Sequence, residues 1–283
     1  MQRGVALFGH NISYSISPVI HNTAFEITSL PFTYLTVDIQ PDRFAKAIDA
    51  VQTLNFAGAN VTIPYKETVT QCTSSLSSVA QKIGAVNTLS FKNDEIFGDN
   101  TDSTGFFNAY ISEIHSLDNK TVLIIGAGGA ARAVCDALIT NISPRKIIIT
   151  NRNVERAERL AEHVRRVYSF NETGTIPLSG IEKYADKING IIQTTPVGSG
   201  LHAGQTPLPD SFQFNREHIA IDLIYNPIET VFLKHAGQLG ARTRNGISML
   251  LHQAGLSFTL WTGVPFPMDE VIPVVMDHIK RRT

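Results

Sequence analysis

A glycine-rich segment near the middle of the chain has the residue types that bind a dinucleotide. An apolar run at 122–125 is typical of a buried parallel strand, and small residues follow it at the spacing GxGxxG/A. Glycines there let the backbone turn tightly and approach a pyrophosphate at the N-terminus of the next helix. We therefore predict that the pyrophosphate is bound by Gly126, Ala127, Gly128, Gly129, Ala130 and Ala131.

The end of the following strand predicts which dinucleotide binds. An Asp or Glu about 20 residues after the glycine loop would bind the ribose 2′-hydroxyl of NAD and repel a 2′-phosphate. This chain has Asn151 and Arg152 in that region. Because a guanidinium pairs bidentately with phosphate oxygens, these residues favour NADP.

A second polar segment, near the N-terminus, could bind a carboxylate. Alternation places Ser15 and Ser17 on the same side of an extended segment, directly before a helix expected to start at Pro18. Two hydroxyl donors at a helix N-terminus suit a carboxylate. The alternative is structural, because Ser17 is a candidate N-cap and serines in turns often bond to their own backbone.

Three further polar clusters lie in expected loops, at 60–66, 84–88 and 98–102. In the first, Lys66 follows a proline turn near the start of a helix, where the helix dipole disfavours a cation, and this indicates a functional role. In the third, Asp102 stands where it could be the N-cap of a helix over 103–115. That structural role is compatible with a functional one.

Alternating strand and helix patterns position these loops in two series. The first predicts an open α/β sheet from strands at 5–8, 32–38 and 57–61, helices at 18–30 and 41–55, and an added hairpin at 85–91 and 95–98. The second predicts a doubly wound (Rossmann-type) sheet from strands at 121–125, 146–150, 189–193, 219–224 and 241–244, with helices at 129–140, 154–166 and 229–238. Two last helices are expected at 246–260 and 268–281, with Gly246, Met249 and Gln253 on one face.

Length and composition agree with a soluble two-domain protein. The chain has 283 residues, 43% of them hydrophobic, and a net charge of −1, which argues against nucleic-acid and membrane partners. We expect a cytoplasmic protein, because no secretory leader is recognisable and Cys72 and Cys135 form no disulfide framework. No metal is expected, since His10 and His21 lack partners at ligand spacing, and no Gly-x-Ser-x-Gly elbow indicates a hydrolase.

Together these residues resemble the shikimate dehydrogenase family over nearly the whole chain. The motifs, in family order, are Ser15-Ile-Ser17-Pro18, Asn60-Val-Thr62-Ile-Pro64-Tyr-Lys66, Gly84-Ala-Val-Asn87-Thr88, Asn100-Thr-Asp102, residues 126–133, Asn151-Arg152, Tyr225-Asn226-Pro227 and Gly246-Ile-Ser-Met249-Leu250 with Gln253-Ala254. The resemblance implies an oxidoreductase of the shikimate pathway to the aromatic amino acids, which reduces 3-dehydroshikimate to shikimate reversibly with NADP. It also implies a substrate domain at 1–102 and 247–283, an NADP-binding domain at 103–246 and a cleft between them. We expect a monomer or homodimer.

The resemblance also implies a role for each matching residue. Lys66 and Asp102 would be the catalytic pair, Ser15, Ser17 and Tyr225 would bind the substrate carboxylate, and the ring oxygens would be bound by Thr62, Lys66, Asn87, Asp102 and Gln253. Asn151 and Arg152 would bind the 2′-phosphate, and the ribose–nicotinamide end would be surrounded by Thr195, Gly246 and Met249. The chain departs from the family pattern at Ser103, Asn153 and Gln193, where glycine, threonine and asparagine are usual.

The implied chemistry explains the residue types. Hydride addition to a ketone carbon puts negative charge on the oxygen, so the site needs a positive or donating group and a proton. Lys66 can supply both, and Asp102 can orient it. Two alternatives stay open: a quinate/shikimate dehydrogenase that uses NAD, which Arg152 opposes, and a catalytically silent module that binds NADP or shikimate, which the intact pair of Lys66 and Asp102 opposes.

Overall fold

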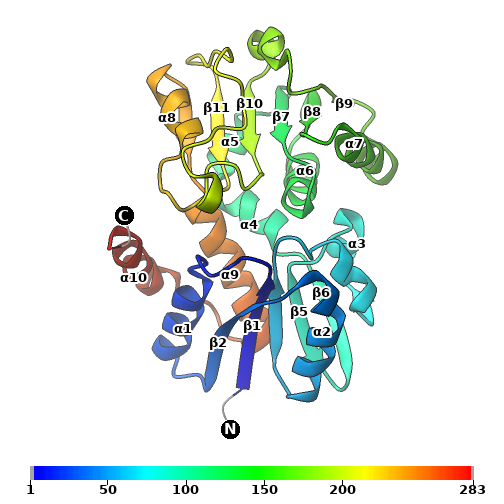
Figure 1. Cartoon of the computed structure of the whole chain (residues 1–283), viewed down its shortest axis with the longest axis vertical. Helices are drawn as coiled ribbons and strands as arrows, with labels where there is room; N and C mark the ends of the chain where they lie inside the picture. Colours follow the sequence, from blue (N-terminus) through cyan, green and yellow to red (C-terminus); the bar gives the residue numbers. More distant parts are fainter. Residues whose placement is uncertain (1–2, 282–283) are drawn as a thin grey trace. The chain divides into compact units, whose positions relative to one another are not determined.

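The computed structural model describes residues 3–281, which divide into two compact units. Unit 1 contains the described residues up to Gly105 and from Leu251 onward, and unit 2 is Phe106–Leu250. Each unit has its own six-stranded sheet (Figure 1).

The sheet of unit 1 brings the ends of four strands to one edge. Its strand order is β2-β1-β3-β5-β6-β4, with parallel pairing in β2-β1-β3 and antiparallel pairing of β5 to both β3 and β6. The carboxyl ends of β1, β3 and β6 therefore meet the amino end of β5. The strands are β1 (Arg3–Gly9), β2 (Phe32–Asp38), β3 (Gly58–Val61), β4 (Ser75–Leu76), β5 (Thr88–Lys92) and β6 (Glu95–Asp99).

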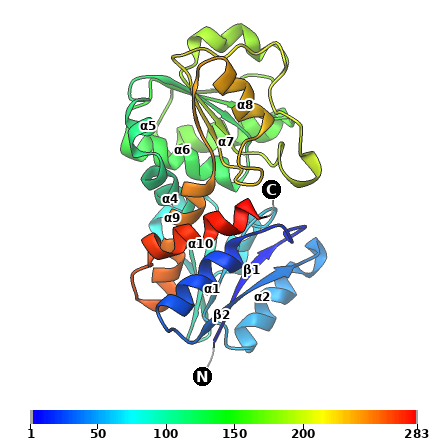
Figure 2. The same ribbon diagram turned by 90° about the vertical axis from the view of Figure 1, so that its left-hand side faces the viewer.

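Helices cover both faces of this sheet. On one face, α2 (Phe44–Thr53) and α3 (Ser78–Ile83) contribute to a core that includes Phe8, Ile48 and Leu89. On the other, α1 (Ser17–Ile27) and α10 (Met268–Lys280) lie side by side (Figure 2). The helix α9 (Ile247–Thr262) also packs there, where Phe258 stacks on Phe25 of α1.

The sheet of unit 2 is parallel throughout and doubly wound, as predicted. Its order is β12-β11-β10-β7-β8-β9, so the order in which the strands are added reverses between β7 and β10, the place where such sheets bind ligands. The strands are β7 (Thr121–Ile125), β8 (Lys146–Thr150), β9 (Thr173–Thr175), β10 (Gly190–Gln193), β11 (Ile219–Asp222) and β12 (Arg242–Arg244). The helices are α6 (Gly129–Asn141), α7 (Val154–Tyr168) and α8 (Val231–Gln238).

Side chains of the central strands alternate between two cores in unit 2. Val122 and Ile124 of β7 join a core with α6 and α7, whereas Leu123 and Ile125 join one that includes residues of α8. A strand buried on both faces needs a continuous apolar run, which is why β7 and β8 were recognisable with their exact bounds.

Several predicted elements differ from the structure. The helix expected over 103–115 is two helices, α4 (Asp102–Ala109) and α5 (Ile111–His115), because Tyr110 leaves helical geometry and its hydroxyl donates to the carbonyl of Asn245. The helix expected at 41–55 begins as a 3₁₀ turn at Pro41–Arg43. The short elements α3, β4 and β9 were not predicted. No helix in the described part of the chain is long and apolar enough to cross a membrane.

Candidate active site

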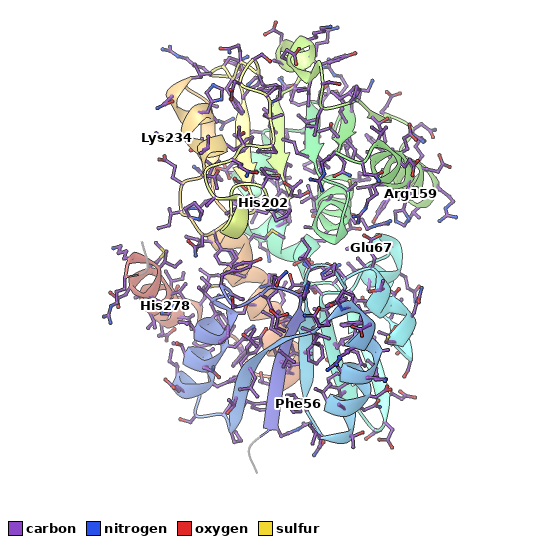
Figure 3. The ribbon with its side chains drawn as sticks, viewed as in Figure 1. Phe56, Glu67, Arg159, His202, Lys234 and His278 are labelled. Atoms are coloured by element: carbon purple, nitrogen blue, oxygen red, sulfur yellow. The ribbon has the colours of Figure 1, made fainter. Side chains whose placement is uncertain are left out.

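The polar clusters of unit 1 lie at the edge where its strand ends meet. The loop with Ser15 follows β1, the turn with Lys66 follows β3, Asn87 precedes β5, and Asp102 follows β6. In Figure 3, Glu67, the neighbour of Lys66, and Phe56, which precedes β3, mark opposite ends of the sheet. The order of the strands thus collects side chains that are far apart in the sequence.

Lys66 and Asp102 form an ion pair at the centre of this edge. Lys66 Nζ donates to Asp102 Oδ2 at 2.5 Å, and the side chains are only 17% and 5% exposed. The backbone also holds Lys66, because its carbonyl accepts from the N–H of Val86 at 2.7 Å. A shielded ion pair keeps both charges in one geometry, which a freely rotating surface lysine would not do.

Asn87 supports the other oxygen of Asp102. Asn87 Nδ2 donates to Asp102 Oδ1 at 2.9 Å, and Asn87 Oδ1 accepts from the backbone N–H of Thr101 at 2.8 Å. Gln253 Oε1 lies 3.4 Å from the same Nδ2. The structure therefore brings together four predicted site residues, Lys66, Asn87, Asp102 and Gln253.

The prediction that Asp102 is an N-cap is wrong, because α4 already begins at this residue. Asp102 is the first residue of the helix, and its own N–H donates to Asn100 Oδ1 at 3.0 Å. Asn100 thus holds the backbone and leaves the Asp102 carboxylate to Lys66 and Asn87. Ser103, where the family pattern has glycine, is buried inside this helix.

The two serines are not arranged as an N-cap and its neighbour. The N-cap of α1 is Ile16, without a side-chain cap, and Ser17 is the first helical residue, so the N-cap prediction for Ser17 is wrong. Ser15 Oγ instead accepts from the Ser17 N–H at 3.2 Å and lies 3.1 Å from Ser17 Oγ. The two hydroxyls are neighbours, Ser15 half-buried and Ser17 buried.

The loop that carries the serines is tied to the strand ends beside it. Asp38, at the end of β2, accepts from the N–H groups of Asn11 and Ile12 at 3.1 and 3.2 Å. The His10 N–H donates to the Ile63 carbonyl at 3.1 Å, next to half-buried Thr62. A Cβ at Gly9 would lie 2.6 Å from Thr62, so a larger residue would push the serine loop and the Lys66 turn apart.

In unit 2 the glycine loop offers backbone donors. Gly126 has a φ of +115°, which disfavours any side chain, and Gly128 is the N-cap of α6 without a side-chain cap. A Cβ at Gly128 would meet no atom within 4 Å. The space beside Gly128 is therefore open, and no side chain caps the first-turn N–H groups of α6, which suits a pyrophosphate.

The end of β8 presents a cation. Arg152 is exposed and makes no hydrogen bond or ion pair with the part of the chain that the structure describes. Asn151 Nδ2 donates to the Asn153 carbonyl at 2.9 Å, and Asn153 caps α7 by accepting from the Arg156 N–H at 3.0 Å. Asn153 thus has a structural role. Sequence reasoning missed Arg156, a second arginine in the first turn of α7, whose position after the cap was the available signal.

Gln193 organises the loop at the end of β10. Its buried amide donates to the carbonyls of Thr195 and Val197 at 3.2 and 2.8 Å and accepts from the Thr195 N–H at 2.8 Å. The longer amide therefore fixes half-buried Thr195. Gly246 precedes α9, and a side chain there would collide with the Leu223 carbonyl. Met249 is buried in the core of unit 2, a place that the helical-face argument did not predict.

A buried carboxylate that sequence reasoning missed anchors the loop with Tyr225. Asp222, at the end of β11, accepts from the Ile224 N–H at 3.0 Å and from Thr230 Oγ1 at 2.7 Å. Burial raises the pKa of Asp222 to about 6, although both hydrogen bonds lower it. Tyr225 is half-buried within that loop.

No group of three or more His, Cys, Asp or Glu side chains suited to a metal ion is found among residues 3–281.

One unit has a doubly wound sheet with an uncapped glycine loop, and the other is an α/β unit with a lysine–carboxylate pair. This combination is typical of one class of protein, the nicotinamide-dependent dehydrogenases. Two family models match the chain, the shikimate dehydrogenase substrate binding domain at residues 7–89 and shikimate / quinate 5-dehydrogenase at residues 110–199. The chain belongs to the shikimate dehydrogenase family, as the motifs predicted.

Individual relatives match over nearly their whole length. The shikimate dehydrogenase (NADP(+)) of Methanocaldococcus jannaschii is 35% identical over 98% of this chain and 97% of its own. A crystal structure of a shikimate dehydrogenase in complex with NADP+ superposes with a TM-score of 0.88 at 34% identity, covering 98% and 96% of the two chains. Quinate dehydrogenase from Corynebacterium glutamicum, in complex with NAD, has a TM-score of 0.87 at 28% identity, covering 98% and 99%.

Proposed function

We propose that this protein is an NADP-dependent dehydrogenase that interconverts 3-dehydroshikimate and shikimate in the pathway to the aromatic amino acids. The observation that carries the proposal is the shielded ion pair of Lys66 and Asp102 in a member of this family. A chain that only bound shikimate or NADP would not need a shielded cation and a buried carboxylate held together, so the pair also opposes the regulatory alternative.

The geometry of the pair suits proton transfer. NADP supplies or accepts the hydride when it is bound. Reduction of the ketone puts negative charge on its oxygen, and Lys66 Nζ can both bind that oxygen and give it a proton. Asp102 holds the ammonium through Oδ2, while Asn87 holds Oδ1, so the carboxylate cannot turn away.

The remaining residues of unit 1 fit a small hydroxylated acid. The neighbouring hydroxyls of Ser15 and Ser17 can donate to the carboxylate, and we assign Tyr225 of unit 2 to the same group. Thr62 and Gln253, both half-buried at the same edge as Lys66, are assigned to ring oxygens with Asn87. Asn87 itself is almost fully buried, so its main effect is on Asp102.

The residues of unit 2 fit NADP. The open side of Gly128 and the uncapped start of α6 can accommodate the pyrophosphate, and exposed Arg152 can pair with the 2′-phosphate, joined by Asn151. We assign Arg156 to the same phosphate. Thr195, Gly246 and Met249 are assigned to the ribose–nicotinamide end, Met249 through the backbone and packing because its side chain is buried.

One alternative has an observation in its favour. The likeness to quinate dehydrogenase with NAD is nearly as strong as that to the NADP+ complex, so activity with quinate is the second candidate. The deciding experiment follows the absorbance of reduced nicotinamide with purified protein, using shikimate or quinate, each with NADP or NAD. We expect the highest kcat/KM with shikimate and NADP; a preference for quinate with NAD would replace the proposal, and no turnover with any pair would refute it.

We also propose that the enzyme is cytoplasmic and that it is a monomer or a homodimer. Cys72 and Cys135 are free thiols, which suits a reducing compartment. Sedimentation of the purified protein measures its mass in solution.

A further inference from the structure

A group of buried hydroxyls and amides lies behind the Lys66–Asp102 pair in unit 1. Its members are at most 5% exposed and come from three strands or strand ends and one helix: Asn60 of β3, Asn87 and Thr88 at the start of β5, Thr101 before α4, and Ser257 of α9. Neither the family motifs nor the proposed mechanism gives a role to the hydroxyls of Thr88 and Ser257.

The Ser257 hydroxyl joins the strands to the helix. Ser257 Oγ lies 2.8 Å from Thr88 Oγ1 and accepts from Asn60 Nδ2 at 3.0 Å. It also lies 3.1 Å from the Gln253 carbonyl of its own helix. Thr88 Oγ1 in turn donates to Asn87 Oδ1 at 2.9 Å.

These bonds determine which way the Asn87 amide points. Asn87 Oδ1 faces the backbone N–H of Thr101 and the hydroxyl of Thr88, both of which can donate to an oxygen. The amide nitrogen must therefore face Asp102 Oδ1, where it donates at 2.9 Å. If the amide turned over, its oxygen would face a carboxylate and its N–H groups would face a backbone N–H, which burial makes costly.

We infer that the hydroxyls of Thr88 and Ser257 are positioning groups that hold the Asn87 amide, and through it the Asp102 carboxylate, in the orientation that Lys66 needs. The inference rests on the proposed function, because it assigns these hydroxyls to the proton-transfer step. Neither hydroxyl is hydrogen-bonded to Lys66 or Asp102 in the part of the chain that the structure describes, so the two hydroxyls act through Asn87.

Removal of either hydroxyl tests the inference. Thr88→Val keeps the shape of the side chain without the hydroxyl, and Ser257→Ala removes only the hydroxyl. Loss of one buried neutral hydrogen bond should lower kcat about 2- to 10-fold with a smaller change in KM for shikimate. The double variant should lose less than the product of the two losses, because both hydroxyls act on the same amide. Thr88→Ser keeps the hydroxyl and should restore most of the kcat.

The matched control is Thr259→Ala on the same helix. Thr259 Oγ1 also donates to the backbone four residues earlier, at 3.0 Å, but the residue is exposed and outside the network. Native kcat in both hydroxyl variants, an equal loss in Thr259→Ala, or a rise in KM alone would overturn the inference. If Ser257→Ala fails to fold, the comparison of Thr88→Val with Thr88→Ser decides. Failure of the proposed function is distinct, because wild-type protein would then not turn over shikimate with NADP.

Discussion

The two units present their candidate binding groups in opposite ways. In unit 1 the candidate groups are side chains held by one another, such as Lys66, Asp102 and Asn87, and their exposure is low. In unit 2 the candidate groups are backbone N–H groups of a glycine loop and an exposed arginine. The difference follows from the chemistry proposed for each unit, because delivery of a proton needs one atom in one place, whereas an anionic cofactor needs donors and charge along its length.

We expect that loss of a candidate side chain in unit 1 mainly lowers the turnover number. Lys66→Ala should lower kcat about 10²–10⁴-fold, because it removes the donor to the developing oxyanion, while KM for shikimate changes far less. Steady-state kinetics measures both constants. Lys92→Ala, an exposed lysine of the same unit, is the control and should be close to wild type. Near-native turnover in Lys66→Ala would remove Lys66 from the mechanism.

Loss of the Arg152 cation in unit 2 should mainly weaken cofactor binding. Arg152→Ala should weaken NADP binding by about 1.5–3 kcal/mol and leave NAD binding nearly unchanged, because only NADP carries the 2′-phosphate. Titration of protein fluorescence with each cofactor measures both affinities. Arg166→Ala, an exposed arginine near the other end of α7, is the control. Equal losses for NADP and NAD would mean that Arg152 supports the fold instead.

Variants of the two serines of unit 1 separate shikimate binding from stabilisation of the fold at the start of α1. Ser15→Ala and Ser17→Ala should each raise KM for shikimate by the equivalent of about 1.5–3 kcal/mol, one hydrogen bond to a charged group. Ser15→Ala should also destabilise the fold by about 0.5–1.5 kcal/mol, because Ser15 Oγ accepts from the Ser17 N–H. Urea denaturation with kinetics separates the effects. Unchanged shikimate kinetics with lower stability in Ser15→Ala would rule out the carboxylate site.

Buried His21 of unit 1 predicts loss of stability in acid. Its ring stacks on Tyr34 at 4.4 Å, and burial lowers its pKa to about 3. The unfolded chain takes up this proton near pH 6.5 and the folded chain does not, so stability falls as the pH falls below 6.5, by about 2 kcal/mol between pH 7 and pH 5. His21→Phe should flatten this slope in urea denaturation, whereas exposed His202→Gln should not.

For Asp222 of unit 2 we expect folding stability to depend on pH in the opposite direction and less steeply. With its pKa raised to about 6, the folded chain keeps this proton while the unfolded chain has lost it, so stability falls as the pH rises from about 4 toward 6. Between pH 5 and pH 7 this contribution is about 1 kcal/mol. Asp222→Asn should gain stability at pH 7 relative to pH 5, unlike exposed Asp210→Asn. An unchanged slope would mean that Asp222 is solvated in solution.

Local patterns explain why some elements were predictable and others were not. The bounds of β2, β7 and β8 were recognisable because apolar and β-branched runs end at polar or glycine residues. The helix α3 has only six residues, fewer than two turns and too short for periodicity, although Ser77 caps it and Gly84 ends it with a φ of +69°. The break at Tyr110 has no local signal, because its partner is the carbonyl of Asn245, 135 residues away.

The sequence by itself determined the motifs, the fold class and the family, because glycines, serines and the Lys66 and Asp102 residue types follow local rules of turn, cap and charge. Only the tertiary structure decided how these residues meet. Lys66 and Asp102 are 36 residues apart, and they pair because antiparallel β5 and β6 return the chain to the edge where β3 ends. The Asp102 carboxylate is buried and needs hydrogen-bond donors, which Lys66 and Asn87 supply. At the start of α4 it is therefore Asn100 Oδ1 that accepts a backbone N–H, that of Asp102 itself.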